Sequence, residues 1–243
     1  LMNFSGQYLI TFTISMLYII GGTGFVVLMD IKRSKRWKGL STNSKLILST
    51  IAGLNLIAFV LLWAIESNNP LTLAPMSLGD QALNAWFHAT VPRSSGFNSL
   101  DLAQMKDAST LVTMLLMFIG GGSMSTAGGI KVGTFIIVLL SVISFLRRED
   151  EIRVFNHSVS QKTSFKAMAV VSITAALIFL GIFSLSLIEP NHQFMDLLFE
   201  AISAACTVGL SRGITGELQP ASLFILMLLM FAGRLGPLTL AYL

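Results

Sequence analysis

The sequence has little charge and almost no cysteine. Only 12% of its 243 residues are charged, whereas 53% are hydrophobic and the mean hydropathy is +0.76. Soluble domains average about 25% charged residues, so this composition predicts a membrane protein with little soluble mass. The single cysteine, Cys206, excludes an internal disulfide and any metal cluster built on cysteines.

The residue patterns of intramembrane enzymes are also missing. The sequence has no His-Glu-x-x-His motif, no pair of intramembrane aspartates and no Gly-x-Ser-Gly motif with a membrane histidine. Its three histidines, His88, His157 and His192, lack metal-ligand spacing, and no ATPase motif is present. We therefore expect neither an enzyme nor a cofactor bound by this chain. The sequence starts at Leu1 rather than Met and runs into Leu243 within an apolar stretch, so we expect part of a longer chain.

Long apolar runs dominate what is present. They lie at residues 8–29, 46–65, 111–146, 165–188 and 222–243. About 20 residues cross a bilayer as a helix, so most of these runs predict single spans. The third is too long for one span, and the glycine-rich residues 120–129 interrupt it. Two weaker segments, 77–91 and 191–205, are amphipathic but too short to cross, which predicts re-entrant helices.

Charge predicts the orientation. Basic residues gather in the connections 30–45 and 147–166 and are scarce elsewhere, which places these connections in the cytoplasm. Their positions argue against nucleic acid as a partner and favour contact with membrane lipid. The re-entrant helices then enter from outside, where most acidic residues also lie, among them Glu66, Glu189 and Glu200. An acidic vestibule that concentrates cations and ordinary solvated loop charge are both open interpretations.

The chain repeats itself. Gly96 and Gly209 are 113 residues apart, as are the similar runs at 114–120 and 227–233. A fainter copy pairs Gly21-Gly22 with Gly120-Gly121. Each unit is an outer helix, a re-entrant pore helix, an extended turn and an inner helix, in an all-α integral membrane fold. The predicted divisions are 1–44 (the inner helix of an earlier repeat and a basic connection), 45–164 (a complete repeat) and 165–243 (a further repeat).

Each re-entrant segment leads into a turn with the character of a cation filter. A Thr-Val-Gly run between apolar segments is typical of filters whose backbone carbonyls replace the hydration shell of K⁺, and glycine permits the φ values that such turns need. The predicted filter turns are 94–98 and 206–211. The candidate K⁺-binding residues, through carbonyls or as the wall, are Ser94, Ser95, Gly96, Phe97, Cys206, Thr207, Val208, Gly209 and Leu210. Because the turns differ, we expect modest discrimination between K⁺ and Na⁺.

The glycine-rich interruption is the predicted gate. Each glycine costs up to ~1 kcal/mol in a helix, so a flexible intramembrane loop is expected, with a simple kink as the alternative. A buried arginine in an apolar helix needs a partner, and Arg234 is predicted to donate to loop carbonyls and to oppose cations, unless it snorkels or pairs with an acid. Lys131 either borders the pore or snorkels. The predicted gate residues are Gly120, Gly121, Gly122, Ser123, Ser125, Thr126, Gly128, Gly129, Lys131 and Arg234.

Four motifs resemble the Trk/Ktr superfamily of K⁺ transport subunits, and most the bacterial Ktr-type membrane subunit. They are RSSGFN at 93–98, GGGSMSTAGGIK at 120–131, CTVGL at 206–210 and GRLG at 233–236. The resemblance implies four repeats around one pore, of which this chain holds the end of the second, the third and most of the fourth.

The same resemblance implies a function. It is that of a pore-forming subunit for K⁺ uptake in the bacterial plasma membrane, with K⁺ as the transported ion and Na⁺ as an activator. The implied partners are a second copy of the membrane subunit, forming a homodimer, and a cytoplasmic nucleotide-binding regulatory ring. A secondary carrier of the alternating-access type, built on broken helices, is the alternative.

Overall fold

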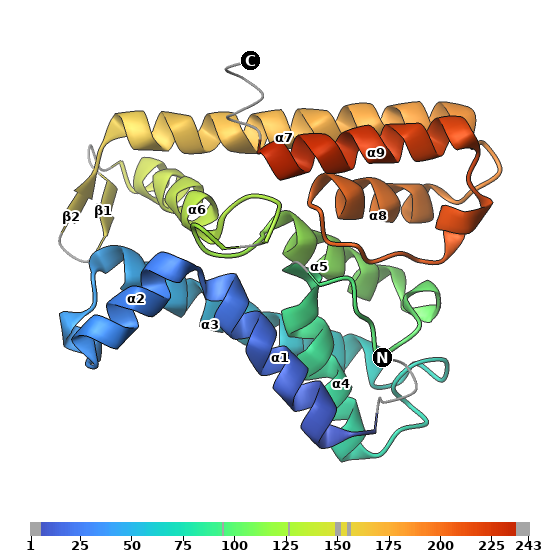
Figure 1. Cartoon of the computed structure of the whole chain (residues 1–243), viewed down its shortest axis with the longest axis horizontal. Coiled ribbons are helices and arrows are strands. Elements are labelled where there is room, and N and C mark those ends of the chain that lie inside the picture. The colour runs from blue at the N-terminus through green and yellow to red at the C-terminus, as the bar shows by residue number, and fades with distance from the viewer. Residues whose placement is uncertain (1–5, 94, 126, 149–151, 155–156, 237–243) are drawn as a thin grey trace.

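The computed structural model describes residues 6–93, 95–125, 127–148, 152–154 and 157–236. The chain is helical, apart from one hairpin in the connection between α6 and α7 (Figure 1). The helices are α1 (Tyr8–Thr23), α2 (Phe25–Ser34), α3 (Thr42–Glu66), α4 (Leu78–Thr90), α5 (Asp107–Phe118), α6 (Val132–Leu146), α7 (Gln161–Ile188), α8 (Phe194–Ala205) and α9 (Pro220–Leu235). Short 3-10 helices are η2 (Trp37–Gly39), η3 (Val91–Arg93), η4 (Leu102–Gln104) and η5 (Ile214–Glu217).

The predicted all-α membrane fold is confirmed, with the hairpin as an addition. Strands β1 (Ile152–Val154) and β2 (His157–Val159) pair antiparallel, with Arg153 opposite Ser158. In the described residues, α3 and α7 are long and apolar enough to cross a membrane, and α1 with α2 forms a bent pair that passes together. The predicted interruption of residues 111–146 separates α5 from α6, and the two short segments form α4 and α8.

Serine residues define where three of the helices begin. Ser41, Ser77 and Ser160 precede α3, α4 and α7, and each side chain accepts a hydrogen bond from the backbone N–H three residues later. This N-cap satisfies one of the backbone donors that a helix leaves open at its start.

The first apolar run differs from the single span expected at residues 8–29. It bends by 94° between α1 and α2. Gly24 lies at the bend with φ of +93°, and a Cβ at this position would overlap the carbonyl of Ser123. Glycine is required there because it reaches this backbone region and leaves room for the approaching chain.

Two buried carboxylates each connect a long helix to a later one: Glu66 joins α3 to α5, and Glu189 joins α7 to α9. Glu66, at the end of α3, accepts a hydrogen bond from the Lys106 N–H just before α5 at 2.9 Å. Glu189 follows α7 and accepts from the Gln219 N–H and the Ser222 hydroxyl at the start of α9, both at 2.7 Å. Only 1% of Glu66 and 5% of Glu189 is exposed. These carboxylates therefore cap helices, and neither the vestibule nor the solvated-loop interpretation holds for them.

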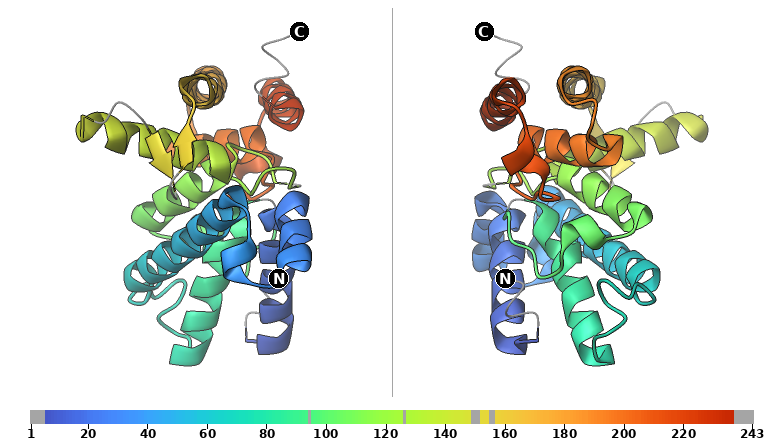
Figure 2. Two further views of the ribbon diagram at one scale, coloured as in Figure 1. Left: turned by 90° about the vertical axis from the view of Figure 1, so that its left-hand side faces the viewer. Right: turned by 90° about the vertical axis from the view of Figure 1, so that its right-hand side faces the viewer.

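The helices pack in two groups that meet at α5 and α8. One group joins α7, α8 and α9, and the other joins α1, α3 and α4 (Figures 1 and 2). The largest core cluster includes Leu62, Met117, Leu185, Phe199 and Val208, so it extends from both groups to the second turn. Large apolar side chains on α3, α7 and α9 remain exposed. Such surfaces are those that a membrane protein presents to lipid.

Candidate ion-conduction site

The structure brings the two predicted filter turns together. A Cβ added to Gly96 would lie 3.1 Å from the Gly209 carbonyl oxygen, and one added to Gly209 would lie 3.5 Å from the Gly96 Cα. Gly96 has φ of +61° and Gly209 has φ of +86°, a region that favours glycine. Both glycines are exposed, whereas Cys206, Val208 and Leu210 are buried. The glycine backbones thus face open space while the side chains of the second turn anchor it in the core.

The second turn is attached to the end of α8 by hydrogen bonds. The Thr207 N–H donates to the Ala204 carbonyl at 3.0 Å, and the Val208 N–H donates to the Ser203 carbonyl at 2.9 Å. The Ser203 hydroxyl in turn donates to the Leu210 carbonyl. Thr207 has φ of +51°, which is uncommon for a residue with a side chain. These contacts direct the Leu210 carbonyl toward α8 and hold the turn in a strained conformation.

The first turn follows η3 and differs in its surroundings. Ser94 lies outside the described residues. The Ser95 hydroxyl donates to the Val91 carbonyl at 3.0 Å, and the ring of Phe97 lies 6.4 Å from that of Tyr18. Arg93 lies at the end of the short helix and is only 7% exposed. A helix C-terminus favours a cation, and the buried positive charge of Arg93 opposes that effect at the first turn.

The glycine-rich segment forms a loop whose two ends, residues 118–121 and 130–132, are hydrogen-bonded to each other. These hydrogen-bonded ends are called the neck of the loop. Ile119 and Ile130 make a parallel bridge. The Gly120 N–H donates to the Ile130 carbonyl, the Ile130 N–H donates to the Phe118 carbonyl and the Val132 N–H donates to the Gly121 carbonyl, each at 2.9 Å. A simple kink has no such closure, so the alternative of a kink is excluded. Thr126 lies outside the described residues.

The loop lies against the second turn and against the bend between α1 and α2. A Cβ at Gly128 would overlap the Cys206 carbonyl and the Thr207 hydroxyl. On the other side, the Gly122 N–H donates to the Gly22 carbonyl at 2.7 Å. A Cβ at Gly120, Gly121 or Gly129 would also meet atoms at under 3.0 Å. These glycines allow three backbone segments to meet beside the turn.

Lys131 contacts the carbonyls of the glycine-rich loop. Its ammonium donates to the Ser125 carbonyl at 3.4 Å and to the Ala127 carbonyl, so it folds back over the loop rather than snorkelling. Arg234 lies in the last turn of α9 and interacts electrostatically with Lys131. Two positive charges therefore adjoin the loop, where the sequence predicted one as the barrier.

A cleft of about 440 Å³ runs beside the second turn. Its lining includes Glu200 on α8, Thr207 and Gly209 on the turn, and Met230 and Arg234 on α9. The cleft thus joins a carboxylate, the glycine backbone of the turn and the basic end of α9. Over the described ranges, no three His, Cys, Asp or Glu side chains are grouped as a metal site, so backbone oxygens are the candidate ligands for a cation here.

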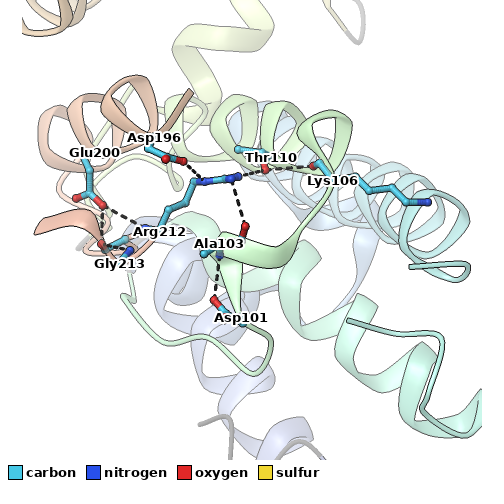
Figure 3. A network of polar contacts seen from close by, with 9 residues as sticks. Asp101, Ala103, Lys106, Thr110, Asp196, Glu200, Arg212 and Gly213 are labelled. Carbon is cyan, nitrogen blue, oxygen red and sulfur yellow. Dashed lines mark hydrogen bonds and ion pairs between the residues drawn. The ribbon is translucent and has the colours of Figure 1, made fainter. Parts of the chain in front are cut away.

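Arg212 connects the chain after the second turn to the neighbouring repeat (Figure 3). Its Nε donates to Asp196 on α8 at 2.6 Å, one terminal nitrogen donates to the Thr110 hydroxyl on α5 at 2.6 Å, and the other donates to the Ala103 carbonyl at 3.4 Å. The sequence reasoning missed this residue, because a single arginine in an outer loop carries no pattern. The guanidinium fixes the position of the second turn relative to the first.

The fold and the opposed turns define an integral membrane transport protein, built from long outer helices and short helices that end within the bundle. The family model "TrkH: Cation transport protein" matches residues 1–243. The chain belongs to this family. Membership places it among transport proteins rather than enzymes, as the sequence predicted.

Relatives and a solved structure agree with this assignment. The chain is 42% identical over 242 residues to the Ktr system potassium uptake protein B of Bacillus subtilis, covering 100% of this chain and 54% of that protein. It is 35% identical over 232 residues to the potassium/sodium uptake protein NtpJ of Enterococcus hirae, covering 94% and 51%. The potassium transporter TrkH of Vibrio parahaemolyticus has the same fold, with a TM-score of 0.79, 19% identity and coverage of 97% and 52%. The chain spans about half the length of these proteins.

Proposed function

We propose that this chain forms part of the pore of a bacterial K⁺ uptake system in the plasma membrane. The observation that carries the proposal is the contact between Gly96 and Gly209, whose exposed backbones lie together although they are 113 residues apart in the chain. Carbonyl oxygens on such backbones are the ligands that replace the hydration shell of K⁺. Family membership and the potassium uptake proteins among the relatives support the same function.

The proposed filter consists of the two turns. Gly96 and Gly209 supply exposed carbonyls, together with Ser94, Ser95, Thr207 and Val208, whereas Phe97, Cys206 and Leu210 shape the wall. Their backbone carbonyls are the proposed K⁺ ligands. The two turns differ in sequence and in charge environment, so a pore built from them has fewer matched sites than a symmetric one. Modest discrimination against Na⁺ follows.

The proposed gate is the loop between α5 and α6 together with Lys131 and Arg234. Its proposed members are Gly120, Gly121, Gly122, Ser123, Ser125, Thr126, Gly128 and Gly129, beside the two basic residues. The loop contacts Cys206 and Thr207 of the second turn. Its glycines gather at and beside its hydrogen-bonded neck, at residues 120–122 on one side and 128–129 on the other. A loop hinged in this way can move aside without unfolding either helix.

Regulation and assembly belong to the same proposal. We place a second copy of the membrane subunit, a cytoplasmic nucleotide-binding ring and membrane lipid as partners, K⁺ as the transported ion and Na⁺ as the activator. The proposed repeat divisions are 1–44, 45–164 and 165–243, since α3–α4–turn–α5 and α7–α8–turn–α9 have the same order of elements.

Uptake of Rb⁺ tests the function. The full reading frame that encodes this chain is expressed in bacteria that lack their own K⁺ uptake systems, with and without external Na⁺. We expect Rb⁺ uptake and growth at low K⁺, stimulated by Na⁺, with flux that rises with the driving force. Absence of uptake would contradict the proposal, and saturating flux by alternating access would favour the carrier.

The gate is tested by removing its positive charges. Lys131→Gln weakens the contacts with the loop carbonyls, and Arg234→Ala removes the second charge. Both variants are expected to raise Rb⁺ flux at equal amounts of protein in the membrane, as is deletion of residues 121–128. Lys166→Gln, an exposed lysine on α7, is the control. Flux that stays at the wild-type level in all the variants would remove this role.

A further inference from the structure

The chain that follows the first turn is held by a side chain of the short helix before it. His88 lies on α4 and is 1% exposed. Its Nε2 accepts hydrogen bonds from the backbone N–H groups of Ser99 at 3.4 Å and Leu100 at 3.2 Å. An imidazole nitrogen that accepts carries no proton, so the ring is neutral with its proton on Nδ1. His88 therefore acts as a neutral, buried hydrogen-bond acceptor for Ser99 and Leu100, which follow the first turn.

The second turn has the same arrangement with a different acceptor. Glu200 lies on α8 and is 5% exposed. One oxygen of its carboxylate accepts from the Arg212 N–H at 3.1 Å and from the Ser211 hydroxyl, and the other accepts from the Thr215 hydroxyl at 2.9 Å. Three donors from residues 211–215 converge on one carboxylate, and Figure 3 shows Glu200 beside Arg212. This carboxylate is therefore engaged with the chain that follows the second turn.

The two arrangements correspond in the repeat. Ser99 follows Gly96 by three residues, and Arg212 follows Gly209 by three residues, so equivalent N–H groups are the donors. The acceptors are offset by one position, because the residue 113 after His88 is Ala201 and not Glu200. The sequence repeat therefore does not show the correspondence, which appears only in the contacts.

We propose that His88 and Glu200 are positioning residues that set the spacing of the filter carbonyls and thereby the preference for K⁺ over Na⁺. This inference rests on the proposed function. Each residue holds the segment that follows a filter turn, while hydrogen bonds to the preceding helix hold the segment before it. The glycine between the two segments therefore has little conformational freedom. A hydrogen-bond donor left unpaired in a buried site is costly. Loss of either acceptor therefore allows the segment after the turn to shift until its N–H groups are paired again.

Arg212 extends the effect of Glu200 beyond its own repeat. Its N–H is held by Glu200, while its guanidinium contacts Thr110 on α5. Displacement of the segment after the second turn therefore also disturbs the contact between Arg212 and Thr110 on α5. For this reason Glu200 is expected to have the larger influence of the two acceptors on selectivity.

The experiment compares K⁺ and Na⁺ uptake by the protein that contains this chain, in membrane vesicles with matched amounts of protein. Glu200→Gln removes the charge and replaces one of the two accepting oxygens with a donating NH₂ group, whereas His88→Phe removes the accepting nitrogen. We expect each change to lower the ratio of K⁺ to Na⁺ uptake about tenfold, equal to ~1.4 kcal/mol. His88→Gln keeps an acceptor oxygen at similar reach and is expected to restore most of the ratio lost in His88→Phe. Glu217→Gln, an exposed carboxylate in η5, is the matched control.

The outcomes separate this inference from the proposed function. If the wild-type protein takes up neither K⁺ nor Rb⁺, the proposed function is wrong. If the wild type prefers K⁺ and both acceptor variants keep its ratio, the positioning role is overturned. Should Glu200→Gln not reach the membrane, Thr215→Val removes one donor and leaves the carboxylate in place. A smaller drop in the ratio is then expected, and an unchanged ratio would overturn the role of Glu200.

Discussion

Single carboxylates at the ends of long helices position neighbouring helices in this protein. Glu189 accepts from the Gln219 N–H and the Ser222 hydroxyl at the start of α9. These hydrogen bonds, the backbone one first, hold the pKa of Glu189 below its ordinary value of 4.5. Because the folded-state pKa is lowered, the stabilisation is fully present above pH 4.5 and is lost as the pH falls through the lowered pKa.

Glu189→Gln tests this contribution. We expect the wild-type protein in detergent to unfold at lower temperature as the pH falls below 4.5, and the variant to be less stable at neutral pH with a weaker dependence on acid. Thermal unfolding across this pH range is the measurement, with Glu217→Gln as an exposed control. Identical pH profiles for the variant and the wild type would contradict the capping role.

Arg212 is a second residue that holds separate helices together, because it contacts both α8 and α5. Arg212→Gln breaks the ion pair with Asp196 and the contact with Thr110 on α5. The side chains of this pair are 8% and 18% exposed, so we expect a loss of about 3 kcal/mol, the lower end of the range for breaking buried pairs. Denaturant unfolding in detergent measures it, and Lys166→Gln should change little. A loss equal to that of the control would show that the guanidinium does not join the repeats.

The sequence alone predicted some of the hydrogen-bonding roles of these side chains and missed others. Burial decides whether Glu66, Glu189 and Glu200 are solvated charges or acceptors, and burial depends on neighbours distant in sequence. His88 was set aside because it lacked metal spacing, whereas its role is to accept backbone hydrogen bonds. Lys131 was expected either to border the pore or to snorkel, and its ammonium instead donates to the Ser125 and Ala127 carbonyls of the loop.

At the scale of elements, the glycines show which helices must approach closely. A Cβ at Gly233 on α9 would overlap the carbonyl of Ala205 at the end of α8, whereas a Cβ at Gly53 on α3 has no atom within 4 Å. Gly233→Ala is therefore expected to push α9 away from the second turn and to abolish Rb⁺ uptake. Gly53→Ala should keep uptake and gain slightly in helix stability.

Membrane insertion and Rb⁺ uptake of the two alanine variants make the comparison. Equal uptake by both would mean that the contact between α8 and α9 does not position the turn. Because both changes add the same methyl group within an apolar helix, any difference arises from the neighbour and not from helix propensity.

Local signals predicted the elements well and their bends poorly. Apolar length marks α3 and α7, the amphipathic pattern marks α4, and glycine density marks the interruption between α5 and α6. The 94° bend at Gly24 was missed, because it depends on the backbone of residues 122–123 packing against it. The match of Gly21-Gly22 with Gly120-Gly121 was the available signal, and the structure shows that these two glycine segments are in contact.

At the scale of the whole molecule, the sequence repeat predicted that the turns at Gly96 and Gly209 are equivalent, but it did not predict that they lie in contact. The interval between Gly96 and Gly209 identifies related turns, yet nothing in it says that they meet. Their approach depends on α5 packing against α8 and on the Arg212 contacts between the repeats. The chain spans about half the length of its relatives.

The central claim is that the backbone at Gly209 selects K⁺, and one pair of variants tests it most directly. Gly209→Ala and Gly236→Ala place the same side chain at positive φ, +86° and +84°, with backbone strain in both, but only Gly209 lies in the turn against Gly96. The measurement is the ratio of K⁺ to Na⁺ uptake by the full protein in vesicles. We expect Gly209→Ala to lose K⁺ preference while Gly236→Ala retains it. Equal ratios in both variants and the wild type would contradict the account.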